Sequence, residues 1–266
     1  MTAQELLQQG QLAAATEAVV QTVKSKPGDV PARIFLFELL AAAGAFDRAA
    51  KHLEVVAEKA PAMLEGIASY RGVLAAEQAR AQLFERGVGA PQRLTAQPLD
   101  PEPSLSALRC LLTGAVDEAE RLTSAARAKA AAVPGVADGV AFDDIRDADD
   151  LLCPYLEVIA QGLYGWIPFE QITKLEFSEI RFLRDTLWRP ANITLTDGLS
   201  ATMFVPVRYP SSAAHADEAV RLGRSTAWVG TPGLSRGVGQ RAYVLGEEVR
   251  YILELGTIEL NAAGSP

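Results

Sequence analysis

The N-terminal part of the chain contains two copies of one pattern, and the copies lie 34 residues apart. Gly10 is followed seventeen residues later by Pro27, and Gly44 is followed seventeen residues later by Pro61. After each glycine, an apolar residue stands at the second position, alanine at the fifth and an apolar residue at the ninth. This period indicates stacked helical hairpins, because a single hairpin of this kind does not bury its apolar face alone.

Each repeated position has a physical role in such a hairpin. The glycine ends the first helix, the alanine lets the second helix approach closely, and the proline ends the second helix. The pattern is that of the second-helix half of a tetratricopeptide repeat. The first-helix half departs from it, since Arg33 and Leu40 stand where tryptophan and tyrosine are usual.

A third, irregular copy begins 70 residues after the second, where Gly114–Ala119 echoes Gly44–Ala49. Between the copies, apolar residues spaced by four, three and four positions predict another amphipathic helix; they are Met63, Ile67, Tyr70 and Leu74. Residues 86–103, with two glycines and four prolines, predict a loop. We therefore expect a helical-hairpin array over residues 1–133, with a concave groove of the kind that receives a peptide or helix. The alternative is that the array only supports the second half of the chain.

The composition changes after this array, and we predict a second domain over residues 134–266. Asp197-Gly198 stands between two apolar segments as a tight turn does, which predicts a β-hairpin. Gly246-Glu247 predicts a second hairpin, between Arg241–Leu245 and Glu248–Leu255. We expect two or three helices followed by a small antiparallel sheet or partial barrel, which makes the whole chain an α+β protein.

Five aspartates lie within residues 143–150. A calcium loop counted from Asp147 would need a ligand at position five and glycine at position six, but Leu151 and Leu152 stand there. We instead expect an acidic first turn of a helix from about Leu151 to Leu163, where aspartate favours the positive end of the helix dipole. Contact with a partner is the alternative.

Two glycine motifs resemble enzyme signatures without the required context. Gly233–Gly237 matches the nucleophile elbow, but that motif needs a later histidine, and the last histidine, His215, comes earlier. Gly237–Ala242 matches the dinucleotide fingerprint, but it leads into a strand-like segment where the fingerprint needs a helix, so we expect a flexible turn. We predict no enzyme activity, no catalytic residues and no cofactor.

The few potential metal ligands are scattered along the chain. Cys110 and Cys153 form no CxxC pair, and the two histidines, His52 and His215, show no zinc-site spacing relative to them. We therefore predict no metal site and no disulfide framework, with both cysteines acting as small apolar residues.

The net charge and the hydropathy of the chain limit the classes of partner that it can bind. With 25 basic and 33 acidic residues, the formal charge is −8, which argues against nucleic acid or an anionic membrane as a partner. No apolar run reaches the length of a membrane span, and the N-terminus lacks the features of a signal peptide. We expect a cytoplasmic protein.

Five short blocks follow the array, and four of them contain tryptophan, arginine or aspartate. They are Phe142–Asp150, Leu156–Val158, Tyr164–Pro168, Leu187–Ala191 and Arg221–Trp228. With these blocks behind diverged helical repeats, the chain resembles the ImpE family, also called SciE or TagJ, over essentially its whole length. Members of this family are accessory proteins of type VI secretion systems.

The resemblance implies an adaptor that acts on the contractile sheath. Some family members bind the N-terminal helix of the small sheath subunit, TssB (VipA), and have been linked to sheath disassembly by the ATPase ClpV. The resemblance therefore implies the same partner helix here, with ClpV involved indirectly. A scaffold for another secretion-system component and a hydrolase in the C-terminal domain are the alternatives.

Two surfaces are candidates for binding that helix. An amphipathic helix laid in a groove is a common recognition mode, and an acidic chain favours a helix with basic residues. The first candidate is the groove of the array, with Arg33, Phe37 and Leu40. The second is the C-terminal domain, with Trp166, Trp188, Arg224 and Trp228, because tryptophan and arginine are frequent at interface hot spots.

Both residue types of the second surface also have a structural interpretation. The three tryptophans can equally belong to the core. Arg224 can equally form a buried pair, and we expect its partner to be one of three aspartates; these are Asp147, Asp149 and Asp150.

Overall fold

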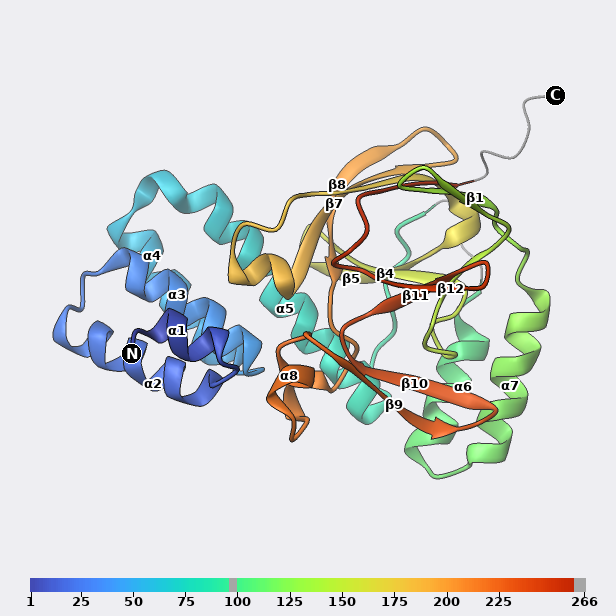
Figure 1. Ribbon diagram of the computed structural model, residues 1–266, viewed down its shortest axis with the longest axis horizontal. Coiled ribbons are helices and arrows are strands. Elements are labelled where there is room, and N and C mark those ends of the chain that lie inside the picture. The colour runs from blue at the N-terminus through green and yellow to red at the C-terminus, as the bar shows by residue number, and fades with distance from the viewer. Residues whose placement is uncertain (96–99, 261–266) are drawn as a thin grey trace.

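The 34-residue repeat folds into packed pairs of helices, in a computed structural model that describes residues 1–95 and 100–260 (Figure 1). The described part of the N-terminal half contains α1 (Ala3–Gln8), α2 (Leu12–Ser25), α3 (Val30–Ala42), α4 (Phe46–Lys59), α5 (Leu64–Arg86), α6 (Glu102–Leu112) and α7 (Val116–Lys129). No helix in these described residues is both long and apolar enough to cross a membrane.

The repeated glycines and alanines act as the repeat pattern predicts. Gly10, Gly44 and Gly114 take φ values of 79°, 75° and 81°, each in the turn between two helices. These left-handed conformations favour glycine because it has no Cβ. The alanines five positions later are completely buried, which allows paired helices to approach closely. The predicted helical hairpins are confirmed.

The helix α5 connects the helical and β-rich parts of the molecule. It packs on α4 on one side and on β5 (Leu163–Pro168) and β4 (Tyr155–Ala160) on another. The predicted helix is confirmed, and Ile67 and Leu74 of its stripe are buried, but Met63 precedes α5 and is exposed. Figure 1 shows α5 running from the α1–α4 group toward the sheets, with the α6–α7 pair apart from that group, near β10 (Leu234–Gly239).

The C-terminal half is built from antiparallel strands. The remaining strands in its described part are β1 (Gly135–Ala137), β2 (Val140–Phe142), β3 (Ile145–Asp147), β6 (Ile172–Phe177), β7 (Trp188–Leu195), β8 (Ser200–Pro206), β9 (Thr226–Thr231), β11 (Ala242–Leu245), β12 (Glu248–Tyr251) and β13 (Thr257–Leu260). They form an eight-stranded sheet in the order β2-β1-β13-β6-β7-β8-β4-β5, a three-stranded sheet β12-β11-β3 and the hairpin β9-β10.

The predicted α+β fold and both predicted hairpins are confirmed. Strands β7 and β8 flank Asp197-Gly198, and β11 and β12 flank Gly246-Glu247. The second strand of the latter hairpin ends at Tyr251, earlier than expected. The predicted loop begins after α5 ends at Arg86 and contains an isolated bridge from Gln92 to Gly165, while residues 96–99 lie outside the described part.

The helix predicted from about Leu151 to Leu163 is wrong. This segment contains a turn and then β4, in which Tyr155 to Ile159 are all buried. A strand that lies between two neighbours and is covered by a helix is apolar on both faces, so its sequence lacks the alternation that identifies a strand. In the described C-terminal half the one α-helix is the short α8 (Glu218–Arg221), so the expectation of two or three helices is also wrong.

The predicted flexible turn at Gly237–Ala242 is wrong as well. Gly237 and Gly239 belong to β10 and pair with Trp228 and Thr226 of β9. The ring of Tyr209 explains why position 237 is glycine, because a Cβ there would lie 2.2 Å from this ring. These glycines let the strand approach an aromatic ring closely.

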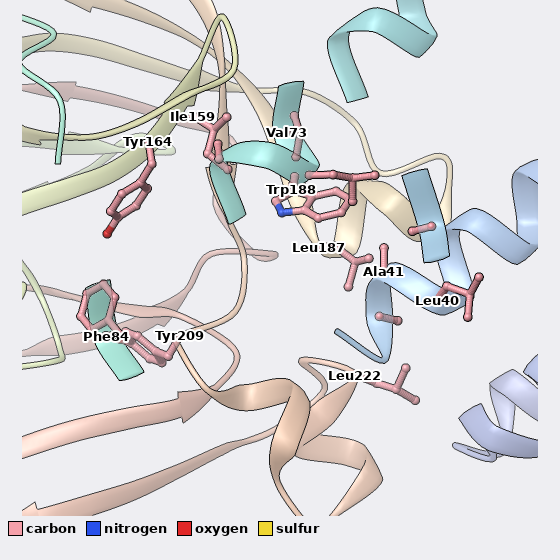
Figure 2. Close-up of a cluster of buried hydrophobic side chains, with 14 of the residues drawn as sticks. Leu40, Ala41, Val73, Phe84, Ile159, Tyr164, Leu187, Trp188, Tyr209 and Leu222 are labelled. Atoms are coloured by element: carbon pink, nitrogen blue, oxygen red, sulfur yellow. The ribbon is translucent and has the colours of Figure 1, made fainter. Parts of the chain in front are cut away.

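One hydrophobic cluster of the described residues spans the two halves, and a second lies mainly in the C-terminal half. The array ends at Lys129 and the first strand begins at Gly135, but the buried cluster continues across this change. Figure 2 shows Leu40 and Ala41 of α3 near Leu187 and Trp188, at the start of β7. The helical array is therefore packed against the β-rich half.

We expect the close backbone approach of α5 to the β4–β5 turn to be sensitive to side-chain volume. A Cβ on Gly72 would lie 3.0 Å from the Cα of Gly162 in the β4–β5 turn. Gly72→Val should therefore lower the free energy of unfolding by about 1–3 kcal/mol, measured by urea denaturation.

The matched control is Gly66→Val in the same helix. A Cβ on Gly66 would meet no atom within 4 Å, and valine favours the helix more than glycine does. This variant should be as stable as the wild type or slightly more so. Equal stability of the two variants would contradict the proposed contact.

Candidate functional site

An apolar groove of about 530 Å³ opens on the helical array. It is lined mainly by side chains of α3 and α5, with further contributions from α1 and α4 and from the segment that precedes β7. Its apolar residues include Ile34, Phe35, Phe37, Met63, Ile67 and Phe182. A groove with few polar groups that is formed by packed helices suits an apolar helix face.

Two apolar side chains of this groove are largely exposed to solvent. Met63 is 43% exposed, and Phe182, which comes from the C-terminal half, is 52% exposed. Isolated exposed apolar residues are common on protein surfaces, but residues grouped around a groove mark an interaction site. The groove therefore has the character of a binding surface.

One wall of the groove contains a buried ion pair between the two halves. Arg184, from the C-terminal half, donates to the carboxylate of Glu38 on α3. Burial raises the pKa of Glu38, and the neighbouring Arg184 opposes this shift. The guanidinium carbon of Arg184 lies 3.8 Å from the ring centroid of Phe182 and 5.3 Å from that of Tyr70. These distances are typical of cation–π contacts.

Tyr70 of α5 connects this wall to the shared core. Its ring centroid lies 5.8 Å from that of Phe37, 6.4 Å from that of Trp188 and 5.3 Å from that of Phe204. The aromatic residues of the groove are thus continuous with residues at the start of β7 and on β8. The shape of the groove therefore depends on the sheet as well as on the helices.

The three residues predicted for the array groove have different environments in the structure. Phe37 lines it, although its side chain is only 1% exposed. Arg33 donates to the carbonyl of Pro27 at 2.7 Å and lies 3.4 Å from Nδ1 of His52. Leu40 lies in the shared core (Figure 2). A role of these residues in partner binding stays a prediction.

The three tryptophans also have different environments. Trp188 is buried and donates from Nε1 to Glu77 at 2.9 Å, and Trp166 is buried and donates to the hydroxyl of Tyr164. Trp228, on β9, is 42% exposed. Trp166 and Trp188 are therefore core residues, while binding of a partner by Trp228 stays a prediction.

The predicted pair between Arg224 and an aspartate is wrong. Arg224 donates to the carbonyls of Leu7 and Gln8, at 2.8 and 3.0 Å, at the end of α1. A guanidinium here satisfies carbonyls that lack partners within the helix and complements the negative end of its dipole. The three aspartates have other partners, and these pairs are Asp147–Arg241, Asp149–Arg236 and Asp150–Arg127.

Other residues of the C-terminal half bind helix ends of the array in the same way. Arg208 donates to the carbonyl of Ala42 at 2.7 Å, at the end of α3. Glu218 accepts from the backbone N–H of Leu12 at 2.8 Å, at the start of α2. Cations at helix C-termini and carboxylates at N-termini are favourable. Sequence analysis missed these contacts, because their partners lie more than 150 positions away.

A buried ionic network joins α5 to the sheets. Arg80 of α5 donates to Glu157 of β4 through two hydrogen bonds of 2.8 and 2.9 Å, and Arg241 also donates to Glu157. Burial opposes ionisation of Glu157, but the two guanidiniums outweigh this and lower its pKa to about 2. Arg241 pairs with Asp147 as well, so the acidic segment is part of this internal network.

A larger cavity than the groove, of about 760 Å³, lies on another part of α5. Its lining includes Glu77, Arg80 and Arg208, which are already bound to other groups of the protein. The groove, in contrast, contains apolar side chains that no other part of the described chain covers. We therefore take the groove as the candidate site.

The described residues contain no metal-binding cluster, and the elbow-like motif is part of a strand. No group of three or more histidine, cysteine, aspartate or glutamate side chains within them could hold a metal ion. Ser235 of the elbow-like motif lies in β10, where its backbone N–H donates to Asp150, and a strand continues after it. This geometry lacks the strand–turn–helix of a nucleophile elbow.

The ionic network gives a direct stability test. Glu157→Gln should lower the free energy of unfolding by about 3–5 kcal/mol, because it removes the carboxylate that Arg80 and Arg241 share and leaves the buried network one negative charge short. Chemical denaturation followed by circular dichroism measures this. Glu118→Gln, which breaks an exposed pair with Arg121, is the control and should leave the unfolding midpoint unchanged.

The lowered pKa of Glu157 also fixes the sign of its pH dependence. Its stabilising contribution should be fully present above about pH 4.5 and lost as the pH falls toward 2. Glu157→Gln should therefore lose less stability than the wild type over this range. A variant as stable as the wild type at pH 7 would contradict the network.

Comparisons with known proteins agree with these features. A family model described as ImpE protein matches residues 139–259, and a tetratricopeptide repeat model matches residues 6–83. A protein of Pseudomonas aeruginosa (strain PAO1) named type VI secretion system accessory component TagJ is 38% identical over 249 residues, which cover 92% of this chain and 85% of that protein.

A solved structure shares the fold. The crystal structure of protein VPA1032 from Vibrio parahaemolyticus matches with a TM-score of 0.89 and 24% sequence identity, and the match covers 97% of each chain. At this level of identity the similarity concerns the fold alone.

Proposed function

Because this chain belongs to the ImpE family, which includes the type VI secretion accessory component TagJ, we propose that it is a non-enzymatic adaptor of such a system. We further propose that its apolar groove binds the N-terminal helix of the small sheath subunit, TssB (VipA). The observation that carries this proposal is the groove on α3 and α5, with Met63 and Phe182 exposed in it.

The form of the groove supports a helical partner. An amphipathic helix binds by placing residues at helical spacing into a continuous apolar groove. Side chains from α3, α5 and the segment before β7 supply such a surface, and the carboxylate of Glu38 within it is already paired with Arg184. The bound face of the partner is therefore apolar, and its exposed face is free to carry charge.

The net charge supports a partner with basic residues outside the bound face. The chain carries −8, so long-range attraction would speed association with a basic helix. A protein bound to the end of a sheath subunit would also change the access of ClpV to the sheath. We therefore extend the proposal to modulation of sheath disassembly.

Fluorescence anisotropy tests the central step. A labelled peptide of the N-terminal helix of the cognate small sheath subunit is titrated with the full chain, because α5 is part of the core that both halves share. We expect saturable binding at micromolar concentration or tighter. Met63→Asp should weaken it at least about tenfold, since it places a carboxylate in the apolar groove.

A residue of equal exposure serves as the control. Leu112, at the end of α6, is 42% exposed and does not line the groove. Leu112→Asp should bind the peptide as the wild type does. Folded wild-type protein that does not bind would refute the sheath-helix proposal and leave a scaffold for another secretion-system component as the adaptor function to test.

A further inference from the structure

We propose that the C-terminal half supplies the specificity-determining wall of the groove. In this inference Phe182 packs against a large uncharged anchor residue of the bound helix, and Arg184 is the positioning residue that holds Phe182. The inference rests on the proposed function and adds to it the chemical nature of the recognised residue.

The backbone that carries Phe182 is ordered although its ring is half exposed. Asp185, which is 6% exposed, accepts hydrogen bonds of 2.9 Å from the backbone N–H groups of Arg181 and Phe182. An exposed aromatic side chain on a fixed backbone loses little conformational entropy when a partner covers it. Such residues are frequent hot spots of binding.

Arg184 fixes the position of this ring relative to the array. Its guanidinium carbon lies 3.8 Å from the Phe182 ring centroid and 5.3 Å from that of Tyr70, while the same guanidinium binds Glu38 of α3. The ion pair is largely buried, with 18% of the arginine side chain and 7% of the glutamate side chain exposed. The wall from the C-terminal half is thus attached to both α3 and α5.

Near Phe182, the groove favours an uncharged residue of the partner over a charged one. Glu38 and Arg184 neutralise each other, so the lining near Phe182 offers no free charge to an incoming group. A charged residue at this place would be desolvated without compensation, whereas a leucine, isoleucine or phenylalanine would cover Phe182. The occupant is therefore an amphipathic helix with a bulky apolar anchor, and the groove is continuous with the interface between the halves.

The test measures peptide affinity for three variants of the full chain, with the sheath-subunit peptide described above as the probe. Phe182→Ala should raise the Kd about tenfold, because it removes the contact with the anchor. Arg184→Lys keeps the charge opposite Glu38 but loses the planar group that contacts both rings, and it should raise the Kd about threefold to tenfold. Melting temperatures show that each variant is folded.

Leu199→Ala is the matched control, because Leu199 is 53% exposed in the β7–β8 turn, and Phe182 is 52% exposed. It should change the Kd less than twofold. An alanine scan of the peptide should identify one apolar position whose substitution has no further effect in Phe182→Ala. This loss of additivity would identify the anchor, and a purely structural role of Phe182 would not produce it.

The outcomes separate this inference from the proposed function. If the wild type binds and Met63→Asp weakens binding, but Phe182→Ala and Arg184→Lys stay within twofold of the wild type, the specificity wall is refuted and the adaptor proposal stands. If the folded wild type does not bind the peptide, the proposed function fails first and this inference fails with it.

Discussion

The buried carboxylate of Glu157 holds the molecule together where the helical array meets the sheets. It lies on β4 and accepts hydrogen bonds from Arg80 of α5 and from Arg241, which follows β10. None of these three groups could be buried as an ion alone, since the cost of desolvation would be several kcal/mol for each. The paired arrangement therefore requires α5 to sit at one place on the sheet. The helices α1–α4 pack successively on one another and on α5, so their position is linked to that of α5.

Arginines at the helix ends extend this constraint to the first two helical pairs. Arg224 and Arg208 bind carbonyls at the ends of α1 and α3. Through Arg224, the block Arg221–Trp228 helps to orient the array, and the acidic block Phe142–Asp150 contributes Asp147 and Asp149 to buried pairs within the C-terminal half. Arg224 and Glu157, which belong to two of the blocks that carry the family resemblance, therefore connect the two halves, while apolar residues of the groove remain exposed.

This division explains how the proposed binding groove can have a defined shape without exposed polar groups of its own. The charged groups needed for a fixed geometry are used internally, and the groove presents apolar side chains whose backbone is already ordered. A rigid apolar surface gains affinity because little conformational entropy is lost on binding. The groove forms only when both halves of the chain are folded together, because Phe182 and Arg184 come from the C-terminal half.

Local sequence patterns were sufficient to predict the turns and hairpins, because their geometry depends on residues that are neighbours in the sequence. The glycines at positions 10, 44 and 114 mark turns because only a residue without a Cβ adopts that conformation easily, and Asp197-Gly198 marks a hairpin for a related reason. Phe37 could be associated with the groove from the repeat alone. Strand β4 could not be recognised, because burial on both faces removes the alternation on which strand prediction depends.

Which distant residues pair with one another could be seen only in the tertiary structure. Glu38 and Arg184 are 146 positions apart, and Arg224 lies 217 positions from Leu7, so no spacing in the sequence connects them. The arginine that we expected to pair with an aspartate instead binds helix carbonyls, since both groups accept the same hydrogen bonds and only the packing determines which one is near. Composition and periodicity therefore determine which helices and hairpins can form, whereas the identity of each buried ionic pair, and with it the second wall of the groove, is determined by how those elements pack.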